Sequence, residues 1–437
     1  MLNLYIYLII YIVFLLGVSY IISKKQSHED YLIGSRNRGG WQIFLSKFAA
    51  AIGAAYFITY TGFAYEYGLG VFTMLLGLII GYLLFAYWAS PKIHAHSKEN
   101  RMYTIGDFVY YRTKNNTAKK VANWFSNIIL LAWLLIGMIG GAKIIQEFGF
   151  LSYEIAVLIT SFVILSYILL AGFRAVLMTD VIQSFVIFVL LILVTFGIIG
   201  GINIGSLFDV ETGKVGFDII FAFFMFGLIS IFSMSNMYQL CYAAKNSRKL
   251  KHGIGLSVIP ILFMAFLLLL IGLFMAQNSP GLDSGLIFTE ALKNFLPVSL
   301  LPLAIVLFFA GIMSSEDTDI YAISSHYAIG KKGNPVKNIR ISTVVLIIIA
   351  LVFSLLFRDI VDVSLLAGGL AMVLSFPMIY LIAGGNKPRK FFASIICGLT
   401  ALIIGFIIFG IEPIVAIPVL IFSALGLLWK SEKHKNI

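Results

Sequence analysis

The chain has 437 residues, of which 60% are hydrophobic and only 12% are charged, and its mean hydropathy is +0.99. This composition excludes an ordinary soluble domain, in which about half of the residues are apolar and about a quarter are charged. The net charge of +11 would favour nucleic acid as the partner of a soluble protein. In a membrane protein the position of the basic residues has to be considered first. We expect an all-α integral membrane protein with no nucleic acid partner.

Hydrophobic runs long enough to cross a bilayer recur along the whole chain. A hydrocarbon core of about 30 Å needs roughly 20 apolar residues per helix. The sequence predicts thirteen such spans, 2–23, 41–69, 71–90, 121–148, 152–171, 175–201, 217–243, 253–276, 298–328, 339–357, 360–383, 391–410 and 413–429. The first run has no basic segment before it and is too long for a signal-peptide core, so we expect it to be a retained helix.

The basic residues alternate between the two sides of the predicted membrane domain. All but five of the 31 lysines and arginines fall in every second connection and in the C-terminal segment. The exceptions are Lys214, Lys293 and Arg358 in the opposite connections and Lys47 and Lys143 inside predicted spans. Basic connections of inserted proteins face the cytoplasm. The sequence therefore predicts a multi-pass protein of the cell (cytoplasmic) membrane with its N-terminus outside and its C-terminus inside.

The connections are too short to form soluble domains, so we expect residues 1–437 to form a single membrane domain. The longest connection, 91–120, is basic and contains an amphipathic segment around YTIGDFVYY. The sequence contains no phosphate-binding loop, nucleophile elbow or metal-binding histidine cluster, and its two cysteines indicate neither a disulfide nor a metal site. We expect a transporter, a channel or a sensor rather than an enzyme, with no organic cofactor.

The second span contains LSKFAAAIGAA, residues 45–55, in which a lysine precedes a run of small residues. Two interpretations stay open. The small side chains could allow close packing against a neighbouring helix, as is common in membranes. Alternatively, Gly53 could mark a broken helix, whose unpaired carbonyls would coordinate a cation at the membrane midplane.

Several segments together resemble the sodium:solute symporter family. SKFAAAIGAAYFITYTGFAYEYGLG is similar to its second helix, RMYTIGDFVYYR to a cytoplasmic segment, and GGAKIIQEFGFLSYE to the end of the fourth helix of proline permeases. YILLAGFRAVLMTDVIQ carries the family's Gly-Gly-x-x-Ala-Val-x-x-Thr-Asp-x-x-Gln pattern, with Ala171 in place of the first glycine. FAGIMSSEDTDIYAISS resembles the ninth helix. YQLCYAAKNSRK resembles the segment after the seventh helix, with Leu240 where the family has arginine.

The resemblance implies a LeuT-like core of two inverted five-helix repeats, residues 41–201 and 215–384. One helix and a loop in 1–40 would precede this core, and two helices in 390–430 would follow it. The first helix of each repeat would be broken, with a substrate site between the broken helices. The function implied is secondary active transport by a monomer, in which sodium drives the symport of a small organic solute, such as proline or a small carboxylate, by alternating access.

The resemblance also implies a sodium site made by the backbone carbonyls of Ala49, Ile52 and Gly311 and the hydroxyls of Ser314 and Ser315. The i, i+3 and i, i+3, i+4 spacings place each set on one face of its helix. Five neutral oxygens suit a hard monovalent cation that must leave again. In the alternative interpretation, the two serines bond to carbonyls of their own helix.

Four charged residues inside predicted spans are candidates for an ion pathway or gate, because such charges are costly in a bilayer. The resemblance associates Asp180 with the inward route of the ion, although it could be a structural hydrogen-bond acceptor. Lys47 and Glu316 depart from the family pattern. Three interpretations of Lys47 stay open. In the favoured one, Lys47 extends to the cytoplasmic headgroups. Alternatively, it pairs with Asp319 or Glu316 as an inner gate, or its ammonium replaces the cation, so that transport is proton-coupled or uncoupled.

The candidate solute contacts are fewer and less specific. Tyr56 aligns with a substrate-contact position of the family, and Thr59, Trp133, Asn236 and Gln239 are candidates from their polarity or aromaticity at a plausible depth. Aromatic residues of membrane proteins more often pack or form interfacial belts, so the solute stays open. A membrane solute sensor that does not transport is the alternative from another functional class.

Overall fold

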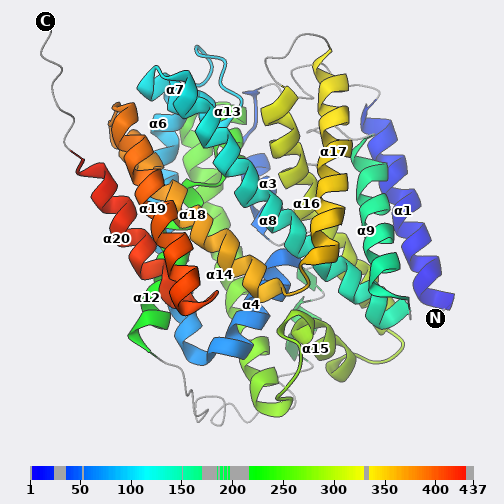
Figure 1. Cartoon of the computed structure of the whole chain (residues 1–437). Helices are drawn as coiled ribbons and strands as arrows, with labels where there is room; N and C mark the ends of the chain where they lie inside the picture. Colours follow the sequence, from blue (N-terminus) through cyan, green and yellow to red (C-terminus); the bar gives the residue numbers. More distant parts are fainter. Residues whose placement is uncertain are drawn as a thin grey trace, which may run out of the picture.

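The computed structural model describes residues 2–23, 36–51, 54–149, 151–169, 216–328 and 334–429, with short pieces between 185 and 196. This part of the chain is almost entirely helical (Figure 1). The first helices are α1 (Leu2–Ser23), α3 (Gly40–Ala51), α4 (Ala54–Tyr67), α5 (Thr73–Leu84), α6 (Ser90–Ala95), α7 (Ile105–Thr113), α8 (Asn116–Gly149) and α9 (Tyr153–Ile168). The later helices are α12 (Phe217–Ile229), α13 (Ser235–Ala243), α14 (Ser247–Asn278), α15 (Ile287–Phe295), α16 (Leu301–Ala328), α17 (Pro335–Leu356), α18 (Ile360–Ile382), α19 (Pro388–Phe409) and α20 (Ala416–Leu427).

Within the described residues, six helices are long and apolar enough to cross a membrane, or seven if a bent pair counts as one span. The chain is therefore a multi-pass membrane protein. Most of the predicted span 175–201 lies outside the described residues, and the count of thirteen spans stays a prediction, as does the division into two five-helix repeats.

Two long helices begin earlier than hydropathy predicts. Helix α8 starts at Asn116 instead of 121, and α14 starts at Ser247 instead of 253. The predicted spans leave out these first residues because apolar character marks only the part of a helix inside the bilayer. At α14, the side chain of Asn246 accepts a hydrogen bond from the backbone N–H of Lys249 at 2.9 Å, and an N-cap of this kind fixes the true beginning of a helix.

The predicted amphipathic segment is helix α7, and a capping box sets its start. The backbone N–H of Asp107 donates to the Thr104 hydroxyl at 3.2 Å, and the backbone N–H of Thr104 donates to the Asp107 carboxylate at 2.8 Å. Two otherwise unsatisfied donors at the helix start are thereby paired. Helices α6, α7 and α13 lie at one end of the molecule and α15 at the other (Figure 1). The first of these ends is the one that the charge pattern assigns to the cytoplasm.

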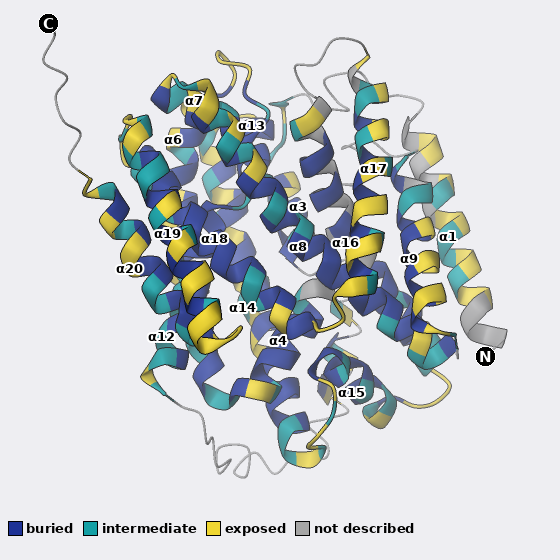
Figure 2. Cartoon of the chain, viewed as in Figure 1, coloured by how far each residue is buried: buried dark blue, intermediate teal, exposed yellow. Residues whose placement is uncertain are grey.

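Burial separates an inner set of helices from an outer set. The most apolar windows of α8 and α18 are 83% and 72% buried, whereas those of α17 and α19 are only 33% and 39% buried. Figure 2 shows exposed residues along α1, α9 and α17 on one side of the molecule and along α19 and α20 on the other. In a bilayer such exposed apolar faces contact lipid, so α8 and α18 form the core that positions the candidate site.

Helices α5 and α12 approach each other at backbone distance. A Cβ atom added to Gly77 would collide with the carbonyl of Phe224, and one added to Gly81 would collide with the carbonyl of Leu228. On the other helix, a Cβ at Gly227 would collide with the carbonyl of Met74. The pair Gly77 and Gly81 forms a Gly-x-x-x-Gly motif, which membrane helices use for close contact.

Candidate ion and solute site

The described residues that are expected to bind sodium belong to two helices, α3 and α16, which contact each other. Helix α16 packs against both α3 and α4. Ala49 lies in α3, and Gly311, Ser314 and Ser315 lie in α16, where Gly311 is buried. The side chains of the two serines and the whole of Ile52 lie outside the described part of the structure, as does Asp180. The five-oxygen site therefore stays a prediction, although its two helices are in contact.

One of the two expected helix breaks lies in the described residues. Residues Phe217–Phe232, which comprise α12 and the short 3-10 helix η4 (Ser230–Phe232), and helix α13 are bent by 41° relative to each other. Residues 52 and 53, which separate α3 from α4, are outside the described residues, so the break predicted at Gly53 is untested. At the start of α13, Met234 makes no side-chain cap hydrogen bond, which leaves the first backbone N–H groups of that helix unsatisfied by a cap.

Lys47 is buried in the interior, with 1% of its surface exposed. Its Nζ lies 5.0 Å from the centroid of the Tyr82 ring, in the geometry of a cation–π contact. The charge of Asp319 on α16 and the hydroxyl of Tyr56 on α4 also act on the ammonium. An interior position with these neighbours differs from that of a lysine extended to the headgroups, whose charged end would be exposed.

Two acidic residues of α16, Asp319 and Glu316, lie near different neighbours. Asp319 is buried and is within electrostatic range of Lys47. Glu316 is 1% exposed and its carboxylate lies against Gly137 of α8, where an added Cβ would collide with it. Asp319 therefore acts on Lys47 in the structure, and the pairing of Lys47 with Glu316 stays a prediction. The assignment of these residues to a gate stays a prediction.

Aromatic side chains from α4 and α8 meet beside the expected substrate position. The rings of Tyr56 and Trp133 are stacked, with centroids 6.1 Å apart and an interplanar angle of 8°. Tyr60 contacts Tyr56 edge-on at 5.1 Å, and Tyr56 is hydrogen-bonded to Tyr82. Trp133 is 6% exposed and its indole Nε1 has no hydrogen-bond partner among the described residues. A buried N–H donor without a partner is costly unless a ligand or water accepts its hydrogen bond.

The other three candidate solute contacts occupy different surroundings. The Thr59 hydroxyl is fully buried and lies 2.9 Å from the hydroxyl of Ser364, so it joins α4 to α18. Gln239 is buried in α13. Asn236 in α13 is half-buried, and its Oδ1 is enclosed without a hydrogen-bond partner in the described part of the structure. The Thr59 hydroxyl is thus bonded within the protein, while Trp133 and Asn236 have unused hydrogen-bonding capacity, and the role of each in solute binding stays a prediction.

Two polar connections that the sequence does not indicate lie nearer the ends of the molecule. At the basic end, His326 of α16 is hydrogen-bonded to Ser235 of α13 at 2.8 Å and to the side-chain oxygen of Asn127 of α8. At the opposite end, Lys143 of α8 forms an ion pair of 2.6 Å with Asp283, which caps the 3-10 helix η5 (Ser284–Leu286) before α15. A histidine or lysine near a helix end carries no sequence signal for such contacts, because each depends on long-range packing.

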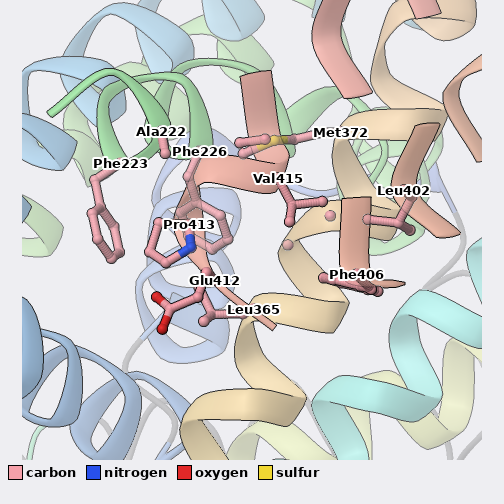
Figure 3. A pocket seen from close by; sticks show the side chains of 13 residues that line it. Ala222, Phe223, Phe226, Leu365, Met372, Leu402, Phe406, Glu412, Pro413 and Val415 are labelled. Carbon is pink, nitrogen blue, oxygen red and sulfur yellow. The ribbon is translucent and has the colours of Figure 1, made fainter. Parts of the chain in front are cut away.

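A small apolar cavity of about 30 Å³ lies away from these residues, between α12, α18, α19 and the 3-10 helix η6 (Pro413–Val415). Figure 3 shows the side chains of Phe226, Leu402 and Phe406 around it and Glu412 at its edge. The Tyr67 hydroxyl donates to Glu412 at 3.3 Å. The cavity is large enough for only a few waters, so it is not a site for an organic solute.

Comparisons with known proteins identify the fold and the family. The chain is 28% identical over 282 residues to a sodium/pantothenate symporter of Haemophilus influenzae and 25% identical over 282 residues to one of Escherichia coli. Each match covers 59% of this chain and 57% of the relative, so the chain spans little more than half the length of these relatives.

Solved transporters share the fold over nearly the whole chain. A Na⁺-coupled sialic acid symporter matches with a TM-score of 0.74 at 19% identity, covering 100% of this chain and 99% of the other. A nucleobase-cation-symport-1 family transporter matches with a TM-score of 0.61 at 14% identity, covering 92% and 95% of the two chains. The model of the sodium:solute symporter family matches residues 31–383, and the chain therefore belongs to the sodium:solute symporter family.

Proposed function

We propose that this protein is a sodium-coupled symporter that carries a small organic carboxylate across the cell membrane by alternating access. The observation that carries the proposal is the packing of α16 against α3 and α4, which brings together the helices that hold Ala49, Gly311, Ser314 and Ser315, in a chain that belongs to the sodium:solute symporter family. Carbonyl and hydroxyl oxygens from these helices would hold Na⁺ without a fixed negative charge, so the ion could be released again.

A carboxylate solute is supported from two directions. Pantothenate and sialic acid, the compounds named for two similar proteins, are both carboxylic acids. In this chain, the unpartnered indole N–H of Trp133 offers a hydrogen-bond donor beside the stacked ring of Tyr56, and a carboxylate oxygen could accept it. Proline, as an amino acid, belongs to the same broad class of carboxylates.

We assign Lys47 and Asp319 to an inner gate within this mechanism. Both are buried, Lys47 on α3 and Asp319 on α16, two helices that contact each other. Their mutual attraction would hold α3 against α16 while the ion is bound, and separating them would open the route to the cytoplasm. Asp180 would lie on the same route.

Thermal unfolding of the purified protein tests the sodium site. The wild-type protein is compared in sodium chloride and in choline chloride at equal ionic strength, together with Ser314→Ala/Ser315→Ala. At a sodium concentration ten times the dissociation constant, binding to the folded state alone would add about 1.4 kcal/mol of stability. The matched control is Ser324→Ala, which removes a buried hydroxyl of α16 that is bonded to Thr343. It should lower stability equally in both salts and keep the sodium response.

Uptake into proteoliposomes tests the coupling and the class of solute. An inward sodium gradient should drive the accumulation of labelled pantothenate, sialic acid or proline, and Ser314→Ala/Ser315→Ala should abolish it. Binding of one of these compounds without any flux would instead identify a sensor. Sodium-independent flux would reject sodium coupling.

Sodium-independent transport by the same fold is a second candidate, favoured by the buried position of Lys47. Its ammonium would occupy the region in which other members hold a cation. This candidate predicts that the wild-type protein does not respond to sodium in the unfolding assay, whereas Lys47→Ala does. The sodium-coupled mechanism predicts the sodium response in the wild-type protein.

A further inference from the structure

A pocket of about 410 Å³ lies at the basic end of the molecule, between α6, α7 and the end of α18. Its volume is within the range of about 300–1,000 Å³ that is typical of small-molecule sites. It is separate from the helices of the proposed sodium and solute sites. Three of the residues that line it, Lys92, His96 and Arg112, have basic side chains, and none of its lining residues is acidic.

Aromatic rings, not carboxylates, hold the cations at this pocket. The Nζ of Lys92 lies 4.6 Å from the centroid of the Trp88 ring, and the His96 ring stacks on Tyr111 with centroids 4.9 Å apart. The Tyr111 ring also lies 4.9 Å from the Nζ of Lys114. Contacts of this kind orient a cation without cancelling its charge. The positive charge of the pocket is therefore uncompensated by any residue that lines it.

The nearest acidic residue of α7 is already engaged elsewhere. Asp107 forms an ion pair of 2.6 Å with Lys119 of α8 and also caps its own helix. Its carboxylate oxygens thus accept from partners outside the pocket. Among the described residues, no carboxylate forms an ion pair with Lys92 or Arg112, so the pocket can take a negative charge from a ligand.

Arg112 presents a preorganised group for an anion. Its Nε donates to the backbone carbonyl of Gly385 at 3.3 Å, which is its only hydrogen bond to the described residues. This contact fixes the plane of the guanidinium beside the turn after α18, where Gly384 has a φ of +115°. The terminal nitrogens stay available, and a fixed guanidinium with free donors matches the geometry of a phosphate group.

The surroundings place the pocket at the depth of lipid headgroups. It lies where α6 and α18 leave the predicted span, on the side that the charge pattern assigns to the cytoplasm. Tyr87, which precedes α6, is 54% exposed and Tyr110 of α7 is 40% exposed, as expected for residues at a membrane interface. Basic pockets between helix ends on the cytoplasmic side are a known form of anionic lipid site.

We propose that this pocket binds a phosphate group through Lys92 and Arg112, and that in the membrane the group is the headgroup of an anionic phospholipid. The bound phosphate would join α6 and α7 to the end of α18, three elements that otherwise meet through few polar contacts in the described structure. The occupied pocket would thereby stabilise the basic end of the protein.

The experiment measures thermal unfolding of the full chain in nanodiscs of phosphatidylcholine alone and of phosphatidylcholine with phosphatidylglycerol. We expect phosphatidylglycerol to raise the unfolding temperature of the wild-type protein by on the order of 2 °C. The variant Lys92→Gln/Arg112→Gln should lose most of this shift. Because Arg112 also bonds Gly385, Lys92→Gln alone, which breaks no hydrogen bond to the described residues, should lose about half of the shift.

The matched control is Lys337→Gln/Arg340→Gln, which removes two exposed basic residues from the start of α17 at the same end of the protein. It should keep the full shift. A further arm adds inorganic phosphate instead of chloride to the detergent-solubilised protein at equal ionic strength. Stabilisation there that Lys92→Gln/Arg112→Gln abolishes would assign the pocket to free phosphate as well. The proposal is overturned if the pocket variants keep the full lipid shift, or if the control loses as much as they do.

Discussion

Replacing Lys47 by methionine tests whether its charge is paired in the interior. The substitution keeps most of the side-chain volume but leaves the Asp319 carboxylate buried without the nearby ammonium. Breaking a buried ion pair in this way costs about 3–5 kcal/mol. For a chain of this size, each kcal/mol corresponds to roughly 1–2 °C in the unfolding temperature, so Lys47→Met should unfold about 5 °C lower than the wild-type protein.

A double variant separates the pair from other effects of the substitution. Exchange of a whole buried pair for apolar residues of similar volume is neutral or stabilising, so Lys47→Met/Asp319→Leu should recover most of the loss. The coupling energy between the two positions should then be at least about 2 kcal/mol. The reasoning fails if Lys47→Met leaves stability unchanged, or if the losses at the two positions simply add.

Lys143 provides the matched control for this measurement. Its Nζ is also paired with an aspartate at 2.6 Å, but the side chain of that partner, Asp283, is 46% exposed. Ion pairs that water reaches contribute about 0–1 kcal/mol. Lys143→Met should therefore shift the unfolding temperature by no more than about 1–2 °C under the same conditions. An equal loss at both lysines would show that burial of Lys47 is not the cause.

Three further substitutions test separate contacts. Gly137→Ala should lower the free energy of unfolding by about 1–3 kcal/mol because its methyl group meets the Glu316 carboxylate. In the same unfolding assay, Gly137→Ala/Glu316→Ala should recover part of this loss, and no recovery would contradict the contact. Trp133→Phe keeps an aromatic ring but removes the N–H and part of the ring volume, so solute affinity should fall about tenfold or more, as measured by equilibrium binding; unchanged affinity would remove Trp133 from the solute site. Ser235→Ala should lower stability by about 1–2 kcal/mol, since His326 loses a buried partner, whereas an unchanged unfolding temperature would mean that water replaces the serine hydroxyl.

Local patterns in the sequence were enough to predict that this is a membrane protein and to predict the short helix α7. Hydropathy identifies the part of each helix inside the bilayer, and the Thr104–Asp107 capping box depends only on residues three positions apart. Hydropathy could not give the true starts of α8 and α14, because a helix that continues into polar residues has no apolar signal there.

The candidate site was predictable only in part, because its contacts join helices far apart in the chain. Lys47 is buried and within electrostatic range of Asp319, which lies on a helix packed against its own. From the sequence, Glu316 was an equal candidate partner for Lys47; the position of its carboxylate against Gly137 depends on the rotation of α16 about its axis. Nothing in the sequence around Tyr82 indicates that it contacts Lys47 and Tyr56. These contacts depend on how α5 packs in the folded protein.

The close contact between α5 and α12 has a consequence for how the protein can change shape. Side chains at an ordinary helix interface can change rotamer and let two helices slide, but at Gly77, Gly81 and Gly227 there are no side chains to rearrange. Sliding would drive one peptide backbone into the other, so these two helices have to move together as one rigid unit. Any transition between outward-open and inward-open forms must then take place at interfaces that have side chains to rearrange, such as the one between α3 and α16.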